Sequence, residues 1–226
     1  MVMPENHNPR LATLLSFNGG YIDTAGFLAL HGLFTAHVTG NFVTLGASLV
    51  LGTSGAIAKL LALPVFCLVI IITRLLAFRL KAQGWPVLRI MLSVKLVLLV
   101  VAAGLALYFG PFPDGDGRWA IITGMSLVSA MAIQNAAHRI HLGQMPPTTL
   151  MTGTTTQMMI DIADLFHGMP PDDKGLAVAR LKRMSQSVIA FAAGCAAAAL
   201  FFGVAREWCF TVPPVLGAAM LMLKVA

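Results

Sequence analysis

The chain has 226 residues, of which 58% are hydrophobic and only 11% are charged, and its mean hydropathy is +0.82. Soluble domains carry about 25% charged residues, so this composition excludes a soluble globular protein and indicates an integral membrane protein. The net charge of +6 comes from Lys and Arg between apolar segments, as topology determinants do, and no nucleic-acid partner is expected.

Eight apolar segments follow the polar residues 1–10, and most are near the length of a bilayer-spanning helix. They are Leu11–His31, Phe34–Leu51, Ala56–Ala77, Val87–Phe109, Trp119–His138, Thr148–Phe166, Met184–Val204 and Trp208–Leu223. The first apolar run lacks a small-residue cleavage site, so we expect a retained helix rather than a signal peptide.

The second and sixth segments are short, and each opens with a polar stretch. These stretches read Phe34-Thr35-Ala36-His37-Val38-Thr39-Gly40-Asn41 and Pro147-Thr148-Thr149-Leu150-Met151-Thr152-Gly153-Thr154, and their Thr-Gly pairs lie 113 residues apart, half the chain. Extended backbone at membrane depth is tolerated only where protein buries it or where it lines a wet cavity. Two such interruptions in matching places indicate the solute site of an inverted-repeat transporter.

Topology depends on whether segments 34–51 and 148–166 cross the bilayer or re-enter. Eight crossings make the two halves parallel, whereas two re-entrant segments leave six crossings and inverted halves. The connections 78–89 and 167–183 carry an excess of Lys and Arg, while 110–118 holds Asp114 and Asp116 against Arg118. Basic loops favour the cytoplasm, and the six-crossing arrangement puts both basic connections there. It also puts Arg10 and Lys224, which lie near the two ends of the chain, on the cytoplasmic side.

We therefore predict an all-α membrane protein with about six transmembrane helices as a 3+3 inverted repeat, two re-entrant half-helices and both termini in the cytoplasm. Its parts are a polar N-terminus (1–10), a first repeat (11–110), an extracytoplasmic linker (111–118) and a second repeat (119–226). Lys59 and Arg206 then fall on the outer side, against the charge rule.

The repeat is defined by position. At the offset of 113 residues, three polar residues of the second segment pair with three of the sixth: Asn41, Thr44 and Ser48 with Thr154, Gln157 and Asp161. Each set is spaced i, i+3, i+7 and therefore lies on one face of a helix. One residue of slip brings Asp23 opposite Asn135. A duplicated unit with inverted topology is the simplest explanation.

Several of these residues resemble the signature of a known family. The D-x-x-G-F pattern at 23–27, the T-x-x-x-T-G-N pattern at 35–41, Gln134-Asn135-Ala136 and the stretch 148–154 are similar to the YoaK family of bacterial inner-membrane proteins. The resemblance covers nearly the whole chain, and it implies a protein of about six helices built around a domain of unknown function. The family pattern has an acidic residue in the region of Lys95, so no carboxylate role is carried over to that position.

Both Thr-Gly motifs are expected to begin half-helices whose free N–H groups and positive dipole ends face each other near the bilayer midplane. Capping and close helix packing are the alternative interpretation. Residues expected to bind the solute are Asp23, Thr35, His37, Thr39, Gly40, Asn41, Asn135, Thr149, Thr152, Gly153, Thr154, Gln157 and Asp161.

Asp23 and His37 are the candidates for proton coupling, because a carboxylate inside an apolar helix is normally inward-facing and paired and a histidine titrates near neutral pH. A structural acceptor role for Asp23, local backbone bonding for His37 and helix bridging by Asn135 remain the alternatives. Lys95 and Arg74 are expected to snorkel to the cytoplasmic face. The three cysteines have no CxxC spacing, so neither a metal nor another cofactor is expected.

These features predict a secondary transporter or channel for a small polar solute. Walker, Rossmann, HExxH and G-x-S-x-G motifs are absent from the sequence, which favours a non-enzymatic role. Two other classes stay open: a membrane enzyme acting on a lipid or isoprenoid, with Asp23, His37 and Asp161 as acid–base groups, and a non-catalytic assembly factor. A monomer of this length would surround a pathway only thinly, so a homodimer is a candidate assembly.

Overall fold

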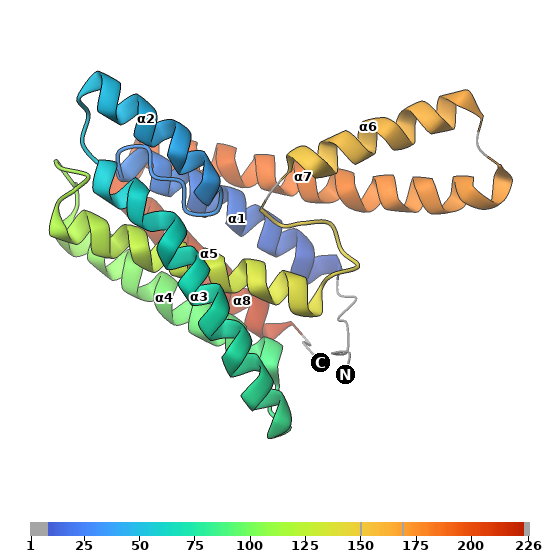
Figure 1. The fold of residues 1–226 in the computed structure, drawn as a ribbon, viewed down its shortest axis with the longest axis horizontal. Helices are drawn as coiled ribbons and strands as arrows, with labels where there is room; N and C mark the ends of the chain where they lie inside the picture. Colours follow the sequence, from blue (N-terminus) through green and yellow to red (C-terminus); the bar gives the residue numbers. More distant parts are fainter. Residues whose placement is uncertain (1–8, 150, 169, 224–226) are drawn as a thin grey trace.

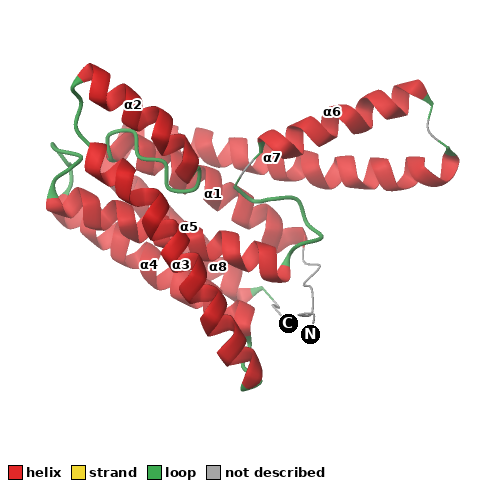
Figure 2. Cartoon of the chain, viewed as in Figure 1, coloured by secondary structure: helices red, strands yellow, loops and turns green. Residues whose placement is uncertain are grey.

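The computed structural model describes residues 9–149, 151–168 and 170–223, and this part of the chain consists of helices and connecting loops (Figures 1 and 2). The helices are α1 (Pro9–Ala29), α2 (Asn41–Leu51), α3 (Ala56–Ala82), α4 (Val87–Phe109), α5 (Arg118–His141), α6 (Thr152–His167), α7 (Pro171–Ala205) and α8 (Val212–Met222), with 3-10 turns η1 (Val38–Gly40) and η2 (Arg206–Thr211). The predicted all-α class is confirmed. Lys224 and the first eight residues lie outside the described residues.

Four helical stretches are long and apolar enough to cross a bilayer: Ala56–Ala82, Val87–Phe109, Arg118–His141 and Asp173–Met222. The last contains both α7 and α8. Helix α1 is not among them, because Asn18, Asp23 and a pair of glycines lower its hydropathy. These stretches support a multi-pass membrane protein, while the predicted count of six crossings remains a prediction.

Helix α1 lies at the centre of the bundle and is buried on most of its circumference. It packs along α7, while α3 packs along α5, and α4 lies against both α5 and α8. Tyr21 and Ile22 of α1 join Leu99 of α4 and Leu127 of α5 in one apolar cluster. Ser16, Asn18 and Asp23 of α1 are therefore buried in protein rather than exposed to lipid.

Local sequence explains where the short helices stop. Gly52 (φ 66°) and Gly168 (φ 102°) follow α2 and α6 in left-handed conformations, and each N–H returns to a helical carbonyl. Helix α7 then begins at Pro171, a favoured first helical residue because its φ is already helical. The predicted connection 167–183 is thus largely helical, since its charged residues share the stretch with good helix formers such as Leu and Ala.

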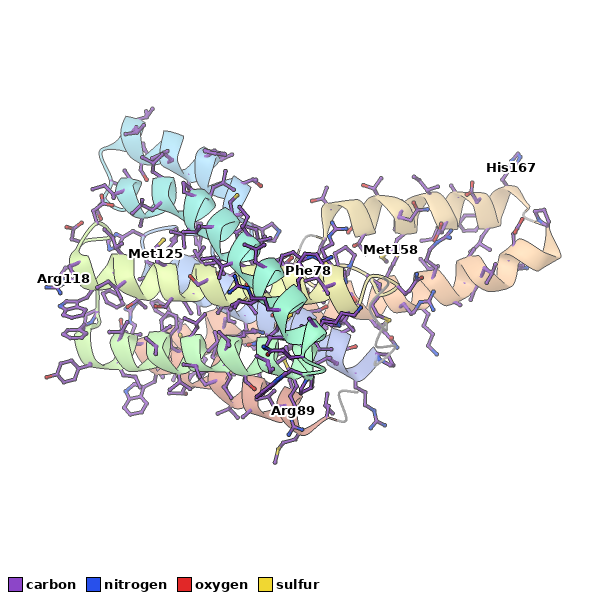
Figure 3. The ribbon with its side chains drawn as sticks, turned by 60° about the horizontal axis from the view of Figure 1, so that its bottom comes forward. Phe78, Arg89, Arg118, Met125, Met158 and His167 are labelled. Carbon is purple, nitrogen blue, oxygen red and sulfur yellow. The ribbon has the colours of Figure 1, made fainter. Side chains whose placement is uncertain are left out.

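Helix α6 packs against the first part of α7, and together they project from the bundle as a hairpin (Figure 1). His167 lies at the tip of this hairpin, whereas Arg118 and Arg89 lie towards opposite ends of the α4–α5 pair (Figure 3). The assignment of these two ends to opposite sides of the membrane remains a prediction from the charge pattern.

The linker between the halves is tied to the start of α3. The carboxylate of Asp116 accepts hydrogen bonds from the backbone N–H groups of Gly55, Ala56, Ile57 and Ala58, at 3.0, 3.1, 2.8 and 3.3 Å. The first N–H groups of a helix have no intrahelical partner, so a residue of the linker caps a helix of the first half.

Candidate functional site

Asp23 organises the first polar stretch. The residue is buried, and Oδ1 accepts the backbone N–H groups of Thr35 and Ala36, both at 2.7 Å, and the Thr35 hydroxyl at 3.3 Å. Two successive N–H groups on one oxygen form an anion-binding concavity. The central helix therefore supplies hydrogen-bond acceptors for the backbone of Thr35 and Ala36, which lies outside regular secondary structure.

The second carboxylate oxygen of Asp23 orients His37. Nδ1 of His37 lies 2.7 Å from Oδ2 of Asp23, and the carboxylate already accepts three other hydrogen bonds, so Nδ1 is assigned as the donor. The imidazole side chain is 30% exposed, against 6% for Asp23. Within the described part of the chain, Nε2 of His37 has no hydrogen-bond partner. This leaves one ring nitrogen available to a ligand.

Asp23 and His37 line a cavity of about 460 Å³ at the junction of α1, the first polar stretch and α7. This volume lies within the range of about 300–1,000 Å³ that is usual for small-molecule sites. The other lining residues are Thr24, Phe27, Leu28, Phe34, Gly40, Phe191 and Cys195. The cavity is thus mainly apolar, with one hydrogen-bonded acid–imidazole pair in its wall.

Aromatic rings form a continuous run along this cavity. The ring centroids of Phe27 and Phe34 are 4.9 Å apart, those of Phe34 and His37 are 6.1 Å apart, and those of His37 and Phe191 are 5.8 Å apart. Phe191 comes from α7 in the second half of the chain. The cavity therefore combines both halves, although every predicted solute-binding residue in its lining belongs to the first half.

The rest of the first motif supports the loop more than it faces the cavity. Asn41 is 1% exposed and uses both atoms of its amide on Phe34: Oδ1 accepts the Phe34 N–H and Nδ2 donates to the Phe34 carbonyl, each at 2.8 Å. Thr39 is exposed in η1, and Gly40 lines the cavity. Asn41 thus positions Phe34 in the ring run.

The second polar stretch is held in a similar way by α5. The Thr149 hydroxyl donates to Oδ1 of Asn135 at 2.8 Å, and Nε2 of Gln134 donates to the Thr148 hydroxyl at 3.1 Å. Asn135 also donates to the Met131 carbonyl at 2.9 Å within its own helix. In both halves, a polar side chain of the first helix bonds the extended stretch that follows.

The second Thr-Gly motif faces a separate hollow. Thr152 and Gly153 are exposed, and Thr152 lines an open groove of about 750 Å³ along α6. Thr154 is buried, and its hydroxyl has no partner within the described residues. The two motifs therefore line different hollows rather than the single site that the sequence predicted between them.

The remaining predicted residues, Gln157 and Asp161, act together on α6. Asp161 is fully buried and accepts hydrogen bonds from Gln157 at 2.8 Å and from Nε and Nη2 of Arg180 at 2.8 and 2.5 Å. A bidentate Arg–carboxylate pair is geometrically specific. Asp161 therefore joins α6 to α7 in the projecting hairpin.

Lys95 differs from its expected position. Its side chain is 1% exposed, and Nζ donates to Oε1 of Gln134 at 2.5 Å, so the prediction that it snorkels to the membrane face is wrong. The reason is that α4 packs closely on α5, where Gln134 offers an acceptor inside the bundle. Lys59 is likewise buried and donates to Ser48 at 2.5 Å.

The sequence did not identify the ring run. Phe27 and Phe34 lie beside the recognised motifs but have the apolar character of any core residue, and Phe191 is distant in sequence. Cys195, one turn beyond Phe191 on α7, also lines the cavity. A spacing of four residues places Phe191 and Cys195 on one helix face, yet nothing in the sequence indicates that α7 packs on α1. Among the described residues, no group of three or more His, Cys, Asp or Glu side chains is placed to hold a metal ion.

Comparison with known proteins gives a family. The profile described as "Protein of unknown function (DUF1275)" matches residues 11–223. The chain is 32% identical over 158 residues to the UPF0700 transmembrane protein YoaK of Bacillus subtilis (strain 168), and this alignment covers 68% of the chain and 66% of YoaK. The match thus spans just under two thirds of that relative. No solved structure matches the chain.

Proposed function

We propose that this membrane protein is a secondary transporter or channel for a small polar solute. The chain belongs to the DUF1275 family, and 32% of its aligned residues are identical to those of YoaK. The solute binds in the cavity at Asp23 and His37. The protein lies in the bacterial inner membrane with both termini in the cytoplasm, as the basic connections favour.

One observation carries the proposal: a buried carboxylate orients an imidazole whose other nitrogen lies open beside an apolar cavity. Ionisable groups at membrane depth are costly and normally mark a solute or proton pathway. Asp23 also bonds the backbone of the first polar stretch. A change of charge on Asp23 or His37 would therefore alter the hydrogen bonds of the backbone that forms the cavity wall. Solute binding and protonation can therefore be coupled at one place.

A duplicated, inverted architecture is consistent with the helix contacts. The first helix of each half packs on the third helix of the other half, as α1 on α7 and α5 on α3. The second helix of each half packs on the third of its own half, as α2 on α3 and α6 on α7. In Figure 1, α2 and α6 run outward in opposite directions, so their first turns are the ends nearest the middle of the molecule. This arrangement supports treating α2 and α6 as the two half-helices.

Equivalent contacts reinforce that correspondence. Ser48 and Asp161, paired by the repeat offset, each bond a basic side chain on the following helix: Ser48 bonds Lys59, and Asp161 bonds Arg180. The Asp23–Thr35 and Asn135–Thr149 contacts lie within one residue of the same offset. In the second half, amide and ion-pair contacts replace the acid–imidazole pair, so we assign solute binding to the first-half cavity.

An enzyme acting on a lipid is the second candidate. A histidine held by a carboxylate through Nδ1 presents Nε2 as a general base, and the thiol of Cys195 lines the same cavity. Asp161 is engaged by Arg180 on the hairpin instead. Under this alternative, Asp23 and His37 alone would be the acid–base groups.

The experiment that tests the proposal uses Asp23→Asn. The asparagine carbonyl can still accept the Thr35 and Ala36 N–H groups, so the loop keeps its shape, while the charge and the acceptor for His37 are lost. We expect purified Asp23→Asn to fold, to lose the thermal shift that solutes give to the wild type, and to lose uptake in proteoliposomes. Asp164→Asn, an exposed carboxylate on α6, is the matched control and should retain both.

Normal uptake by a folded Asp23→Asn protein would contradict the proposal. Turnover of a lipid extract by the wild type, abolished in Asp23→Asn and without solute uptake by either protein, would favour the enzyme instead.

A further inference from the structure

The chemistry of the cavity walls indicates what kind of solute fits. We propose that the solute is a small organic ammonium ion, held among three phenylalanine rings and hydrogen-bonded to Nε2 of His37. This inference rests on the transport function proposed above and names the class of substrate for the same cavity.

Charge favours a cation. The described residues that line the cavity include Asp23 but no Lys or Arg. When the imidazole of His37 is neutral and donates through Nδ1, the Asp23–His37 pair carries the negative charge of the Asp23 carboxylate. The N-terminus of α2, where Gly40 also lines the cavity, contributes only about half a positive charge through the helix dipole. An anion would therefore be repelled by the Asp23 carboxylate, whereas a cation would be attracted to it.

The shape and composition of the walls favour an organic cation over a metal ion or a bare proton. Phe27, Phe34 and Phe191 line the cavity together, and ring faces attract ammonium groups within about 6 Å of their centroids. A metal ion would require several oxygen, nitrogen or sulfur ligands, and no suitable cluster is present in the described part of the chain. The volume of about 460 Å³ accommodates methyl or methylene groups on the nitrogen.

The free imidazole nitrogen adds a preference for an N–H donor. Neutral His37 accepts at Nε2 once Nδ1 donates to Asp23. A tertiary ammonium can donate one hydrogen bond there, and a quaternary ammonium cannot. The site should therefore bind trimethylammonium more tightly than tetramethylammonium, and should bind both more tightly than the neutral, similarly shaped tert-butanol.

The test is equilibrium binding of these three compounds to the full-length protein in neutral detergent at mildly alkaline pH, which favours imidazole over imidazolium. We expect trimethylammonium to bind about tenfold more tightly than tetramethylammonium and tert-butanol to show no saturable binding. Uptake of labelled trimethylammonium into proteoliposomes is measured in parallel.

Two variants assign the contacts. Phe191→Leu removes a ring but keeps apolar bulk, and we expect both cations to bind about tenfold more weakly. Phe201→Leu is the matched control, because Phe201 lies on the same helix and packs on the core without lining the cavity; binding should be unchanged. His37→Asn keeps a donor near the Nδ1 position and removes Nε2, so trimethylammonium should lose its advantage over tetramethylammonium.

The outcomes separate the inference from the transport function. Binding of tert-butanol as tight as that of the cations, cation binding unaffected by Phe191→Leu, or no binding of any of the three compounds would overturn the ammonium assignment. Uptake of a neutral or anionic solute that still depends on Asp23 would overturn it and leave transport standing. Cation binding with the expected variant effects but without uptake would uphold the ligand class and overturn transport.

Discussion

Asn41 and Phe34 exchange two hydrogen bonds, so that the side-chain amide of one completes the backbone of the other. This pairing resembles the exchange between neighbouring β-strands, although only one partner is backbone. It fixes Phe34 between Phe27 and His37 in the ring run. Asn41 therefore influences the cavity through the position of a ring rather than through a free amide.

Asn41→Ala should lower the stability of the protein as well as solute binding. It leaves the buried N–H and carbonyl of Phe34 without partners, at a cost of about 1–3 kcal/mol for each unsatisfied group. The measurement is the thermal midpoint in detergent. Asn41→Asp keeps the acceptor for the Phe34 N–H and should fall between wild type and Asn41→Ala. An unchanged midpoint in Asn41→Ala would show that the amide is not needed to hold the loop.

Gly194→Ala tests the contact between α1 and α7. A Cβ at Gly194 would overlap the carbonyl of Phe17, and one at Gly20 would overlap the carbonyl of Phe191, so the two backbones meet where only glycine fits. Overpacking costs about 1–3 kcal/mol, and we expect a lower thermal midpoint. Gly203→Ala on the same helix has no neighbouring atom within 4 Å of its added Cβ and should be neutral or stabilising. Equal effects of the two substitutions would contradict this contact.

Substitutions of Lys95 and Gln134 should destabilise the protein to different extents. Lys95→Met replaces a buried ammonium by an apolar chain of similar length, but it leaves the buried Oε1 of Gln134 without its donor, at a cost of about 1–3 kcal/mol. Gln134→Leu instead leaves the ammonium without its acceptor, and breaking a buried charged contact costs about 3–5 kcal/mol. The measurement is the thermal midpoint of each single variant in detergent, compared with that of the wild type. Destabilisation by Lys95→Met as large as that by Gln134→Leu would mean that the ammonium itself supports the fold.

Arg180→Gln should loosen the α6–α7 hairpin without disturbing the central bundle. The Arg180 side chain is 43% exposed, so solvent weakens its pair with Asp161 to about 1 kcal/mol, which corresponds to about fivefold faster amide exchange. Hydrogen exchange measured over residues 152–167 reports this change directly. Arg183→Gln, which removes an exposed charge nearby on α7, should leave exchange in α6 as it is. Faster exchange in both variants would point to a general effect of charge.

The sequence predicted the helices well and the packing poorly, for a physical reason. Apolar runs such as 87–109 must form helices in lipid because every backbone group needs an internal partner, so α4 has the bounds that were predicted. The segment from Pro171 to Arg183 was missed as a helix because hydropathy does not report helical structure in charged sequence.

The candidate site shows the same limit. Asp23, His37 and Gly40 were identified because polar residues and breaks in apolar sequence are unusual. Phe191 was not identified, since an apolar side chain on a predicted helix gives no sign of which helix it faces. The contact of α1 with α7 brings Phe191 into the cavity, and that contact depends on the glycines at positions 20 and 194.

The central position of α1 bears on how the protein is made. Helix α1 is synthesised first, yet α7, which packs along it, is synthesised last but for η2 and α8. Until α7 emerges from the ribosome, the face of α1 that packs on α7 has no permanent protein cover, although the backbone of Thr35 and Ala36 is already available to bond Asp23. The packing of the first helix is therefore completed only when the second half of the chain arrives. A chain truncated before α7 would leave α1 without its main partner in the membrane.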